Sequence, residues 1–304
     1  MTGTRVLTAL VLIPIVLAVV LLTPTYVVAI AVAIITVQAL REYFALGEAM
    51  GHRAYRLWTI FCALLLVAQT WRVTKPFGAV LTISTHSGPA TAIPPTAIAP
   101  MTAVAHYLYR IYATESLFFL FVLGLTVLIL FTRRPLVEAL PSAGISSSGF
   151  LLVAFPFSFA VRLHGMAGQG PRLLLFALAV TWAADTTAYF IGRAMGKHPL
   201  APHISPKKTW EGSIGGIIGS LLIAYAAKFF LPIALPHLLA MAFLGNIAGQ
   251  MGDLLESAYK RSAGVKDSGS LLPGHGGVLD RIDAQILCIP VIWYYLVLVN
   301  PAVL

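Results

Sequence analysis

Long apolar runs separated by short polar segments extend along most of the chain. A helix that crosses a hydrocarbon core about 30 Å thick needs about 20 apolar residues. Nine runs meet or approach this length, near residues 6–22, 26–46, 57–71, 117–131, 149–161, 171–191, 212–231, 233–250 and 285–303. The pattern therefore predicts an all-α, polytopic integral membrane protein with about nine transmembrane helices.

The composition agrees with this class. Of the 304 residues, 59% are hydrophobic and only 10% are charged, which excludes an ordinary soluble globule. The net charge is +9, but the positive residues are spread among loops. Anionic lipid and phosphate-bearing substrates therefore suit the chain better than nucleic acid. Cys62 and Cys288 both lie in apolar runs and imply no disulfide framework.

The basic residues predict an orientation. With nine helices and a cytoplasmic N-terminus, the loops on the cytoplasmic side carry 14 of the 20 basic residues. Cytoplasmic loops of membrane proteins are enriched in Lys and Arg. These residues are Arg5, Arg41, Arg53, Arg56, Arg133, Arg134, Arg193, Lys197, Lys207, Lys208, Lys260, Arg261, Lys266 and Arg281.

Residues 72–116 fit this arrangement least well. The segment is apolar in part but contains five prolines, which interrupt the hydrogen bonds that a lipid-facing helix needs. We expect it to form an external loop within an N-terminal helical region, residues 1–140. Residues 141–304 are expected to form a C-terminal transmembrane catalytic region, entered through a short polar connector at 141–149.

Charged residues gather in one stretch, residues 252–283. It contains four of the five aspartates of the chain, namely Asp253, Asp267, Asp280 and Asp283. In a helix, Asp253, Ser257 and Lys260 share one face, and so do Asp280 and Asp283. Converging carboxylate oxygens suit a hard cation such as Mg²⁺. The alternative is a solvated, charged loop with internal salt bridges.

A second polar block covers residues 182–216. Asp185 lies inside an apolar run, where an acid is costly and is a functional candidate, although it could instead pair with Arg193. The sequence Ser-Pro-Lys-Lys predicts a helix start with Ser205 as N-cap and Lys208 at N3. A helix N-terminus with two lysines would suit a triphosphate, whereas the alternative is a basic cytoplasmic loop.

Three smaller features carry weaker arguments. The glycines of LPGHGG would let backbone N–H groups approach a phosphate, and His275 could contact that phosphate or cap a turn. Gly212, Gly215, Gly216 and Gly219 are expected to allow close helix packing rather than to bind ligand. Arg41 and Glu42, at the end of the second apolar run, are expected to lie as a pair at the cytoplasmic membrane interface.

The polar blocks also follow a known pattern. Residues 257–283 read S-x-x-K-R, four residues, K-D-x-G, and then L-P-x-H-G-G-x-x-D-R-x-D, and residues 182–216 contain D-T-x-A-Y and S-P-K-K-T-W-E-G. In these residues the chain resembles the phosphatidate cytidylyltransferases, or CDP-diacylglycerol synthases. The resemblance covers about residues 182–283, whereas the N-terminal half matches in general character only.

The resemblance implies a reaction and a set of residues. The reaction is CTP + phosphatidate → CDP-diacylglycerol + pyrophosphate, with Mg²⁺ as cofactor and room for a second cation. The implied metal ligands are Asp253, Asp280 and Asp283, which form the catalytic set together with Lys260, Arg261 and Lys266. The implied substrate-binding residues are Asp185, Lys207, Lys208, Ser257, Asp267, His275, Gly276, Gly277 and Arg281. It also implies a bacterial inner membrane, with both polar blocks cytoplasmic, and leaves a homodimer open.

Two other classes of protein are weighed against this reading. A secondary transporter would also carry intramembrane acids and glycine-rich breaks, but it would have a mirrored second half. A nucleotide-binding membrane scaffold would explain the basic loops but not the carboxylates. An assay with labelled CTP and phosphatidate separates the three classes.

Overall fold

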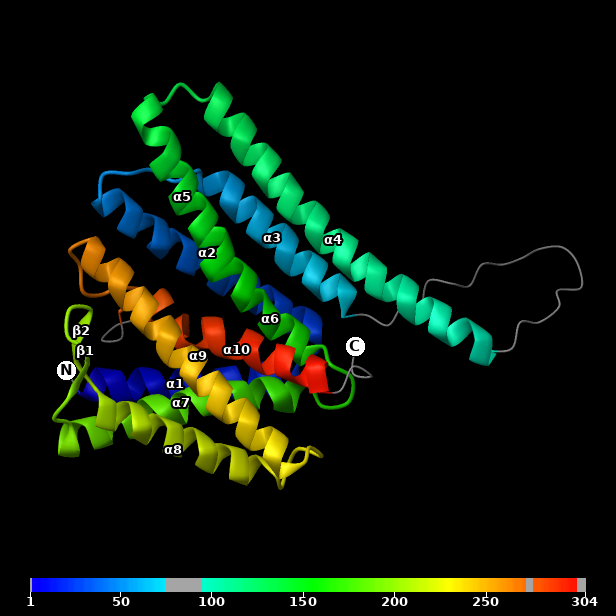
Figure 1. Ribbon diagram of the computed structural model, residues 1–304, viewed down its shortest axis with the longest axis vertical. Helices are drawn as coiled ribbons and strands as arrows, with labels where there is room; N and C mark the ends of the chain where they lie inside the picture. Colours follow the sequence, from blue (N-terminus) through cyan, green and yellow to red (C-terminus); the bar gives the residue numbers. More distant parts are fainter. Residues whose placement is uncertain (1, 75–94, 272–275, 300–304) are drawn as a thin grey trace, which may run out of the picture.

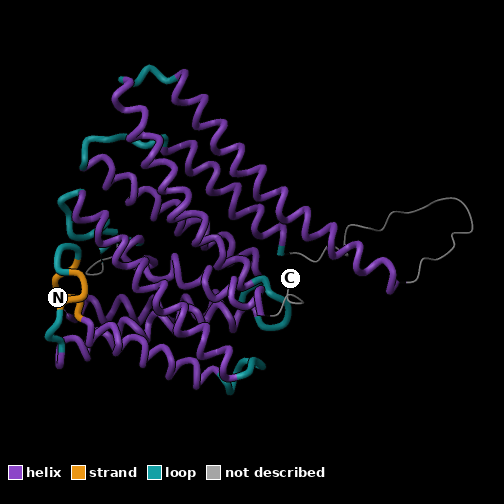
Figure 2. Tube along the Cα trace, viewed as in Figure 1, coloured by secondary structure: helices purple, strands orange, loops and turns teal. Residues whose placement is uncertain are grey.

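The computed structural model describes residues 2–74, 95–271 and 276–299, and these residues are almost entirely helical. Figure 2 shows the helices as a bundle, with a single small two-stranded hairpin at one end. Over its described residues, each of the nine apolar runs of the sequence coincides largely with a helix. The prediction of an all-α membrane protein is therefore confirmed.

Seven helical segments of the described chain are long and apolar enough to cross a membrane. They are Thr25–Ala49, Tyr112–Phe131, Leu136–His164, Gly170–Met195, Trp210–Ala227, Leu235–Ser262 and Leu279–Val299. The first predicted span coincides with a shorter apolar helix, Leu10–Leu22, and the third lies on α3 (Arg56–Val73). The first helix, α1, runs over Thr2–Leu22, and α2 over Thr25–Ala49.

The prediction of an external loop over residues 72–116 is wrong for its second half. Helix α4 extends over Pro95–Phe131 and lies along the outer edge of the molecule (Figure 1). Pro95 is the first residue of α4, where a missing N–H has no intrahelical partner, and Pro100 lies in the second turn. Residues 101–131 contain no proline, so the rest of the helix is uninterrupted.

The polar connector expected at 141–149 is also helical. After a short 3₁₀ turn, η2 (Leu136–Glu138), helix α5 (Ala139–Gly149) continues through a π-helical turn, η3 (Phe150–Ala154), into α6 (Phe155–His164). The hydroxyl of Ser146 donates to Ser142 O at 2.7 Å, and that of Ser148 to Gly144 O at 2.7 Å. Bonds of this kind let serines stay in a helix without leaving polar atoms unpaired.

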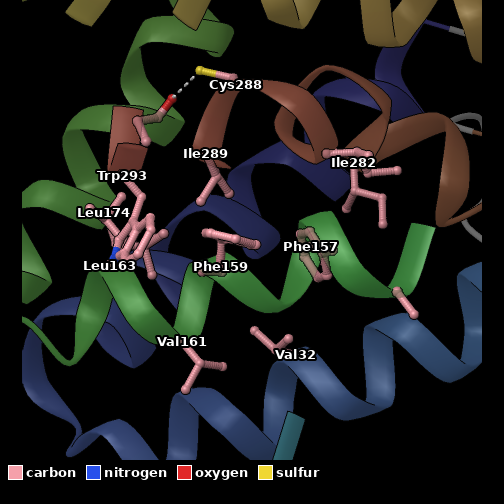
Figure 3. Close-up of a cluster of buried hydrophobic side chains, with 14 of the residues drawn as sticks. Val32, Phe157, Phe159, Val161, Leu163, Leu174, Ile282, Cys288, Ile289 and Trp293 are labelled. Carbon is pink, nitrogen blue, oxygen red and sulfur yellow. Dashed lines mark hydrogen bonds between the residues drawn. The ribbon is translucent and has the colours of Figure 1, made fainter. Parts of the chain in front are cut away.

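Helix α6 lies at the centre of the apolar core. Figure 3 shows Phe157 and Phe159 of α6 between Val32 of α2 and Ile289 of α10 (Leu279–Val299). Phe159 and Ile289 are fully buried, and the ring of Phe159 meets that of Trp293 edge to face at a centroid distance of 5.1 Å. The core therefore joins the N-terminal helices to the last described helix.

The C-terminal helices form two closely packed pairs. Helix α7 (Gly170–Met195) packs along α8 (Trp210–Ala227), and α9 (Leu235–Ser262) packs along α10. A Cβ at Gly215 would lie 2.6 Å from Ile191, and one at Gly219 would collide with Thr187. The predicted packing role of these glycines is confirmed, because α7 approaches α8 only where side chains are absent.

The helix start predicted at Ser205 is wrong. Residues Ser205–Thr209 form strand β2, which pairs antiparallel with β1 (Pro199–Ala201). Helix α8 begins at Trp210, and Thr209 is its N-cap, accepting a hydrogen bond from Gly212 N at 3.1 Å. The chain offers two capping hydroxyls four residues apart. Pairing with β1 keeps the backbone between them extended, so the second hydroxyl caps the helix.

Candidate active site

A cavity of about 820 Å³ lies between α7, α8, α9, the start of α10 and strand β2. Its volume falls within the range of about 300–1,000 Å³ that is usual for small-molecule sites. Nine of the residues implicated by the sequence line it. They are Asp185, Lys207, Lys208, Asp253, Lys260, Asp267, Asp280, Arg281 and Asp283. The two polar blocks therefore meet around one space.

Three acids in this region could hold a metal ion. One carboxylate oxygen from each of Asp253, Glu256 and Asp283 lies within 4.8 Å of the others. Oxygen ligands of this kind suit Mg²⁺, so the residues present fit the implied cation. Glu256 was missed by the sequence analysis. Its spacing of three residues from Asp253 on one helix was the signal that could have identified it.

Asp280, one of the metal ligands implied by the resemblance, accepts several hydrogen bonds from the protein. One of its oxygens accepts from Lys260 Nζ at 2.6 Å, and the other accepts from Gly277 N at 2.8 Å and from Ser268 N at 2.9 Å. Lys260 also forms an ion pair with Glu256, and both are buried. Buried charges are costly unless paired, so Lys260 joins α9 to the first turn of α10.

The basic hairpin contacts the acidic helix directly. Lys208 Nζ lies 2.5 Å from Asp253 Oδ2, and the two side chains are 28% and 29% exposed. Lys207, its neighbour on β2, is exposed and also lines the cavity. The strand therefore brings two positive charges to the space next to the acids.

Asp185 lines the same cavity from α7. Its alternative partner, Arg193, donates instead to Tyr189 Oη at 3.0 Å. Arg193 and Tyr189 also line the cavity. Asp185 therefore faces the polar space between the helices, near the hairpin and α9.

The remaining predicted residues lie around the cavity and not on its wall. Arg261 donates to Ile204 O at 3.3 Å and to Val265 O at 2.9 Å, joining the end of α9 to the hairpin turn. Lys266 is exposed, and Ser257 is buried in α9. Gly276 has a φ of 80°, which favours glycine, and Gly277 is buried. His275 lies outside the described residues.

A row of amides and hydroxyls was also missed. Ser213 Oγ donates to Gln250 Oε1 at 2.5 Å, and Gln250 Nε2 donates to Asn246 Oδ1 at 2.5 Å. All three residues line the cavity. Asn246, Gln250 and Asp253 follow one face of α9 at helical spacing, so the polar stripe in the sequence continues deeper than we inferred.

Glu42 does not form the expected pair with Arg41. Its side chain is only 5% exposed, and it accepts hydrogen bonds from Val278 N at 3.0 Å and Leu279 N at 2.8 Å. Arg41, by contrast, is exposed. The sequence around Glu42 does not indicate that this side chain contacts the start of α10. Glu42 was therefore missed as a neighbour of the site.

Taken together, the helical bundle and the cavity define a membrane-embedded protein with an acidic, lysine-bordered site for a polar ligand. Residues 3–299 match the model of the Cytidylyltransferase family. The chain therefore belongs to that family, and the resemblance seen in its polar blocks is confirmed.

Characterised relatives match part of the chain. A segment of 148 residues is 45% identical to a phosphatidate cytidylyltransferase of Staphylococcus haemolyticus and covers 48% of this chain and 55% of the relative. A segment of 177 residues is 37% identical to the phosphatidate cytidylyltransferase of Bacillus subtilis, covering 57% of this chain and 66% of the relative. The chain thus spans a little over half to about two thirds of the length of the curated relatives that it matches.

Proposed function

We propose that this protein transfers the cytidylyl group of CTP to phosphatidate, giving CDP-diacylglycerol and pyrophosphate. A phosphate oxygen of phosphatidate attacks the α-phosphorus of CTP and forms a new P–O bond. The bond from that phosphorus to the bridging oxygen breaks, and pyrophosphate leaves with the electron pair. Phosphatidate is already ionised, so the step needs no strong general base.

The observation that carries this proposal is the meeting of acids and lysines in one cavity. Asp253 and Asp283, two members of the Asp253–Glu256–Asp283 cluster, line the same cavity as Lys207 and Lys208, within the residues that resemble phosphatidate cytidylyltransferases. Phosphoryl and nucleotidyl transfers depend mainly on positioning and on offsetting the negative charge of the phosphates. Carboxylates that bind a cation and lysines that bind phosphate both serve to position the phosphates and to offset their charge.

We assign a cation-binding role to the three clustered acids. Asp253, Glu256 and Asp283 would hold Mg²⁺, with Asp185 as a further carboxylate beside them for a second cation. Bound Mg²⁺ would offset charge on the triphosphate and on the departing pyrophosphate. Asp280, which accepts from Lys260 Nζ and from two backbone N–H groups, would instead fix the position of Lys260 and of the loop before α10.

The basic residues are assigned to the phosphates. Lys207, Lys208 and Arg281 border the cavity and would bind the triphosphate or the phosphate of phosphatidate. Arg261 and Lys266 do not line the cavity. Arg261 would stabilise the loop that follows α9, and Lys266 would add positive charge to it. The proposal thereby places the chemistry in residues 141–304.

We further propose that both polar blocks face the cytoplasm of a bacterial cell membrane. CTP is a soluble anion of the cytoplasm, whereas the phosphate of phosphatidate lies at the headgroup level. A cavity close to the ends of membrane helices is accessible to both substrates. The distribution of basic residues among the loops supports this orientation.

An activity assay tests the proposal. The purified protein in mixed micelles, supplied with phosphatidate, Mg²⁺ and CTP labelled at the α-phosphorus, should transfer the label into the lipid fraction. Label from the γ-position should appear in pyrophosphate. No label in lipid from a folded protein, with phosphatidate present, would contradict the proposed function.

A further inference from the structure

Glu42 of α2 is saturated by donors that come largely from the region of the site. Its Oε1 accepts from Val278 N at 3.0 Å and from Gln38 Nε2 at 3.1 Å. Its Oε2 accepts from Leu279 N at 2.8 Å and from Ser268 Oγ at 3.0 Å. A buried carboxylate with four donors is paired as fully as one can be. Two of these donors, Ser268 and Val278, belong to the segment between α9 and α10, and a third, Leu279, is the first residue of α10.

These contacts cap a helix. Helix α10 begins at Leu279, and the first N–H groups of a helix have no intrahelical partner. Glu42 accepts from the N–H groups of Val278 and Leu279, and its negative charge is favoured at a helix N-terminus. The capping group of α10 is therefore supplied by another helix, far away in the sequence.

Two glycines allow this approach. A Cβ at Gly269 would lie 2.9 Å from the carboxyl carbon of Glu42, and one at Gly277 would collide with Glu42 Oε2 and with Ser268 Oγ. The backbone of the loop therefore packs directly against the carboxylate on both sides. A side chain at either position would displace Glu42 or the loop.

The carboxylate is linked to the site through Ser268. The hydroxyl of Ser268 lies 3.0 Å from Glu42 Oε2 and 3.0 Å from Asp280 Oδ2. Asp280 in turn binds Lys260 of α9, and Asp283 follows one turn later on α10. A displacement of Glu42 would therefore also move Asp280 and Asp283, through the hydroxyl of Ser268 and the N-terminus of α10.

We propose that Glu42 is a positioning residue, which fixes the start of α10 and the preceding loop so that Asp280 and Asp283 face the cavity. The N-terminal region is then part of the site and not a membrane anchor alone. The catalytic consequence rests on the function proposed above, whereas the structural consequence does not.

The test compares Glu42→Gln with Glu48→Gln, the same substitution on the same helix. Glu48 pairs with Arg56 and lies outside the site. Both oxygens of Glu42 accept a backbone N–H, so the amide of glutamine must turn its NH₂ towards one of these donors and leave that donor unpaired. For Glu42→Gln we expect kcat to fall by about tenfold or more, with the KM values for CTP and phosphatidate changed by less than about threefold.

Hydrogen exchange of the whole protein supplies a readout that does not depend on activity. Glu42→Gln should accelerate exchange of the amides in residues 276–282 by about tenfold or more, while exchange in residues 210–227 stays unchanged. Glu48→Gln should leave exchange and kcat at wild-type values. Unchanged exchange at 276–282 in a folded Glu42→Gln variant would overturn the proposal, whatever happens to activity.

A second variant, Ser268→Ala, tests the same network in case Glu42→Gln does not fold. Ser268→Ala removes the hydroxyl shared by Glu42 and Asp280 without adding bulk, and it should accelerate the same amides and lower kcat by about threefold or more. Combined with Glu42→Gln, it should add less than its separate effect, because both substitutions act on one network. Wild-type exchange in Ser268→Ala, or full additivity of the two, would refute the role of Glu42. If the wild-type protein makes no CDP-diacylglycerol, the proposed function fails and the exchange data still decide on Glu42.

Discussion

Lys208 Nζ lies 2.5 Å from Asp253 Oδ2, so strand β2 and helix α9 are joined by an ion pair inside the cavity. Both side chains are about a quarter exposed, which leaves them within reach of a ligand. Lys207 follows the same strand with its side chain exposed. The two lysines therefore differ in their partners although they are adjacent in the sequence.

We predict that Lys207→Gln and Lys208→Gln weaken the use of CTP more than the use of phosphatidate. A charge-assisted hydrogen bond to a phosphate contributes about 1.5–3 kcal/mol, which corresponds to about a 10- to 150-fold loss in kcat/KM for CTP. Steady-state kinetics with each substrate varied in turn measures the effect.

Lys228→Gln is the control, because Lys228 is exposed at the end of α8 and does not line the cavity. If both hairpin variants impair phosphatidate kinetics and leave CTP kinetics intact, the hairpin binds the lipid headgroup. The triphosphate would then be bound by other basic residues of the cavity wall, such as Arg281.

We predict that Asp283→Asn and Glu256→Gln each raise the Mg²⁺ concentration needed for half-maximal activity. Substitution of residues that only support metal ligands costs about 10- to 100-fold in affinity, so loss of a direct ligand should cost at least about tenfold. Magnesium titrations of activity at saturating CTP provide the measurement. Glu138→Gln, at a carboxylate that contacts His52 away from the cavity, is the control. Normal turnover of either variant at limiting Mg²⁺ would remove that residue from the set of ligands.

Asp280→Asn should behave differently from Asp283→Asn. Its carboxylate binds Lys260 Nζ and two backbone N–H groups, so the loss of charge leaves the buried ammonium with Glu256 alone. We expect the free energy of unfolding to fall by about 1–3 kcal/mol. Denaturant unfolding in detergent measures this change, with Asp283→Asn as the matched comparison. Equal stability of the two variants would show that Asp280 is not a structural link.

The orientation in the membrane can be tested with single cysteines. On a background without Cys62 and Cys288, both of which are buried, a membrane-impermeant thiol reagent should label Ser205→Cys and Ser270→Cys from the cytoplasmic side. Inside-out vesicles and intact cells provide the two directions of access. Labelling of both positions in intact cells would invert the proposed topology.

Much of the site could be predicted from the sequence because charge is scarce in this chain. Four of five aspartates lie within residues 252–283, and helical spacing alone places Asp253 and Lys260 on one face. Glu256 was within reach of the same argument. Asp280 and Asp283 were grouped because they share a helix face, but that spacing gives no sign that Lys260 and two backbone N–H groups of the loop bind the oxygens of Asp280.

Other features depend on contacts that no local pattern contains. Ser205 and Thr209 are both suitable N-cap residues, and pairing with β1 leaves that position to Thr209. The prolines between residues 76 and 100 predict a break in helical structure, but two of them, Pro95 and Pro100, lie inside α4. Glu42 is a polar residue near the end of an apolar helix, and three of its four partners lie more than two hundred residues away.

That separation has a consequence for the order in which the protein is assembled. The hydrogen bonds from Val278 and Leu279 to Glu42 connect residues 236 and 237 positions apart. Contacts of such high sequence separation form late, because closing a long chain segment must precede them. During synthesis α2 leaves the ribosome well before α10. Glu42 therefore lacks its backbone donors until α10 has been synthesised and has packed against α2. Assembly of the acidic site is accordingly one of the last events in the maturation of this protein.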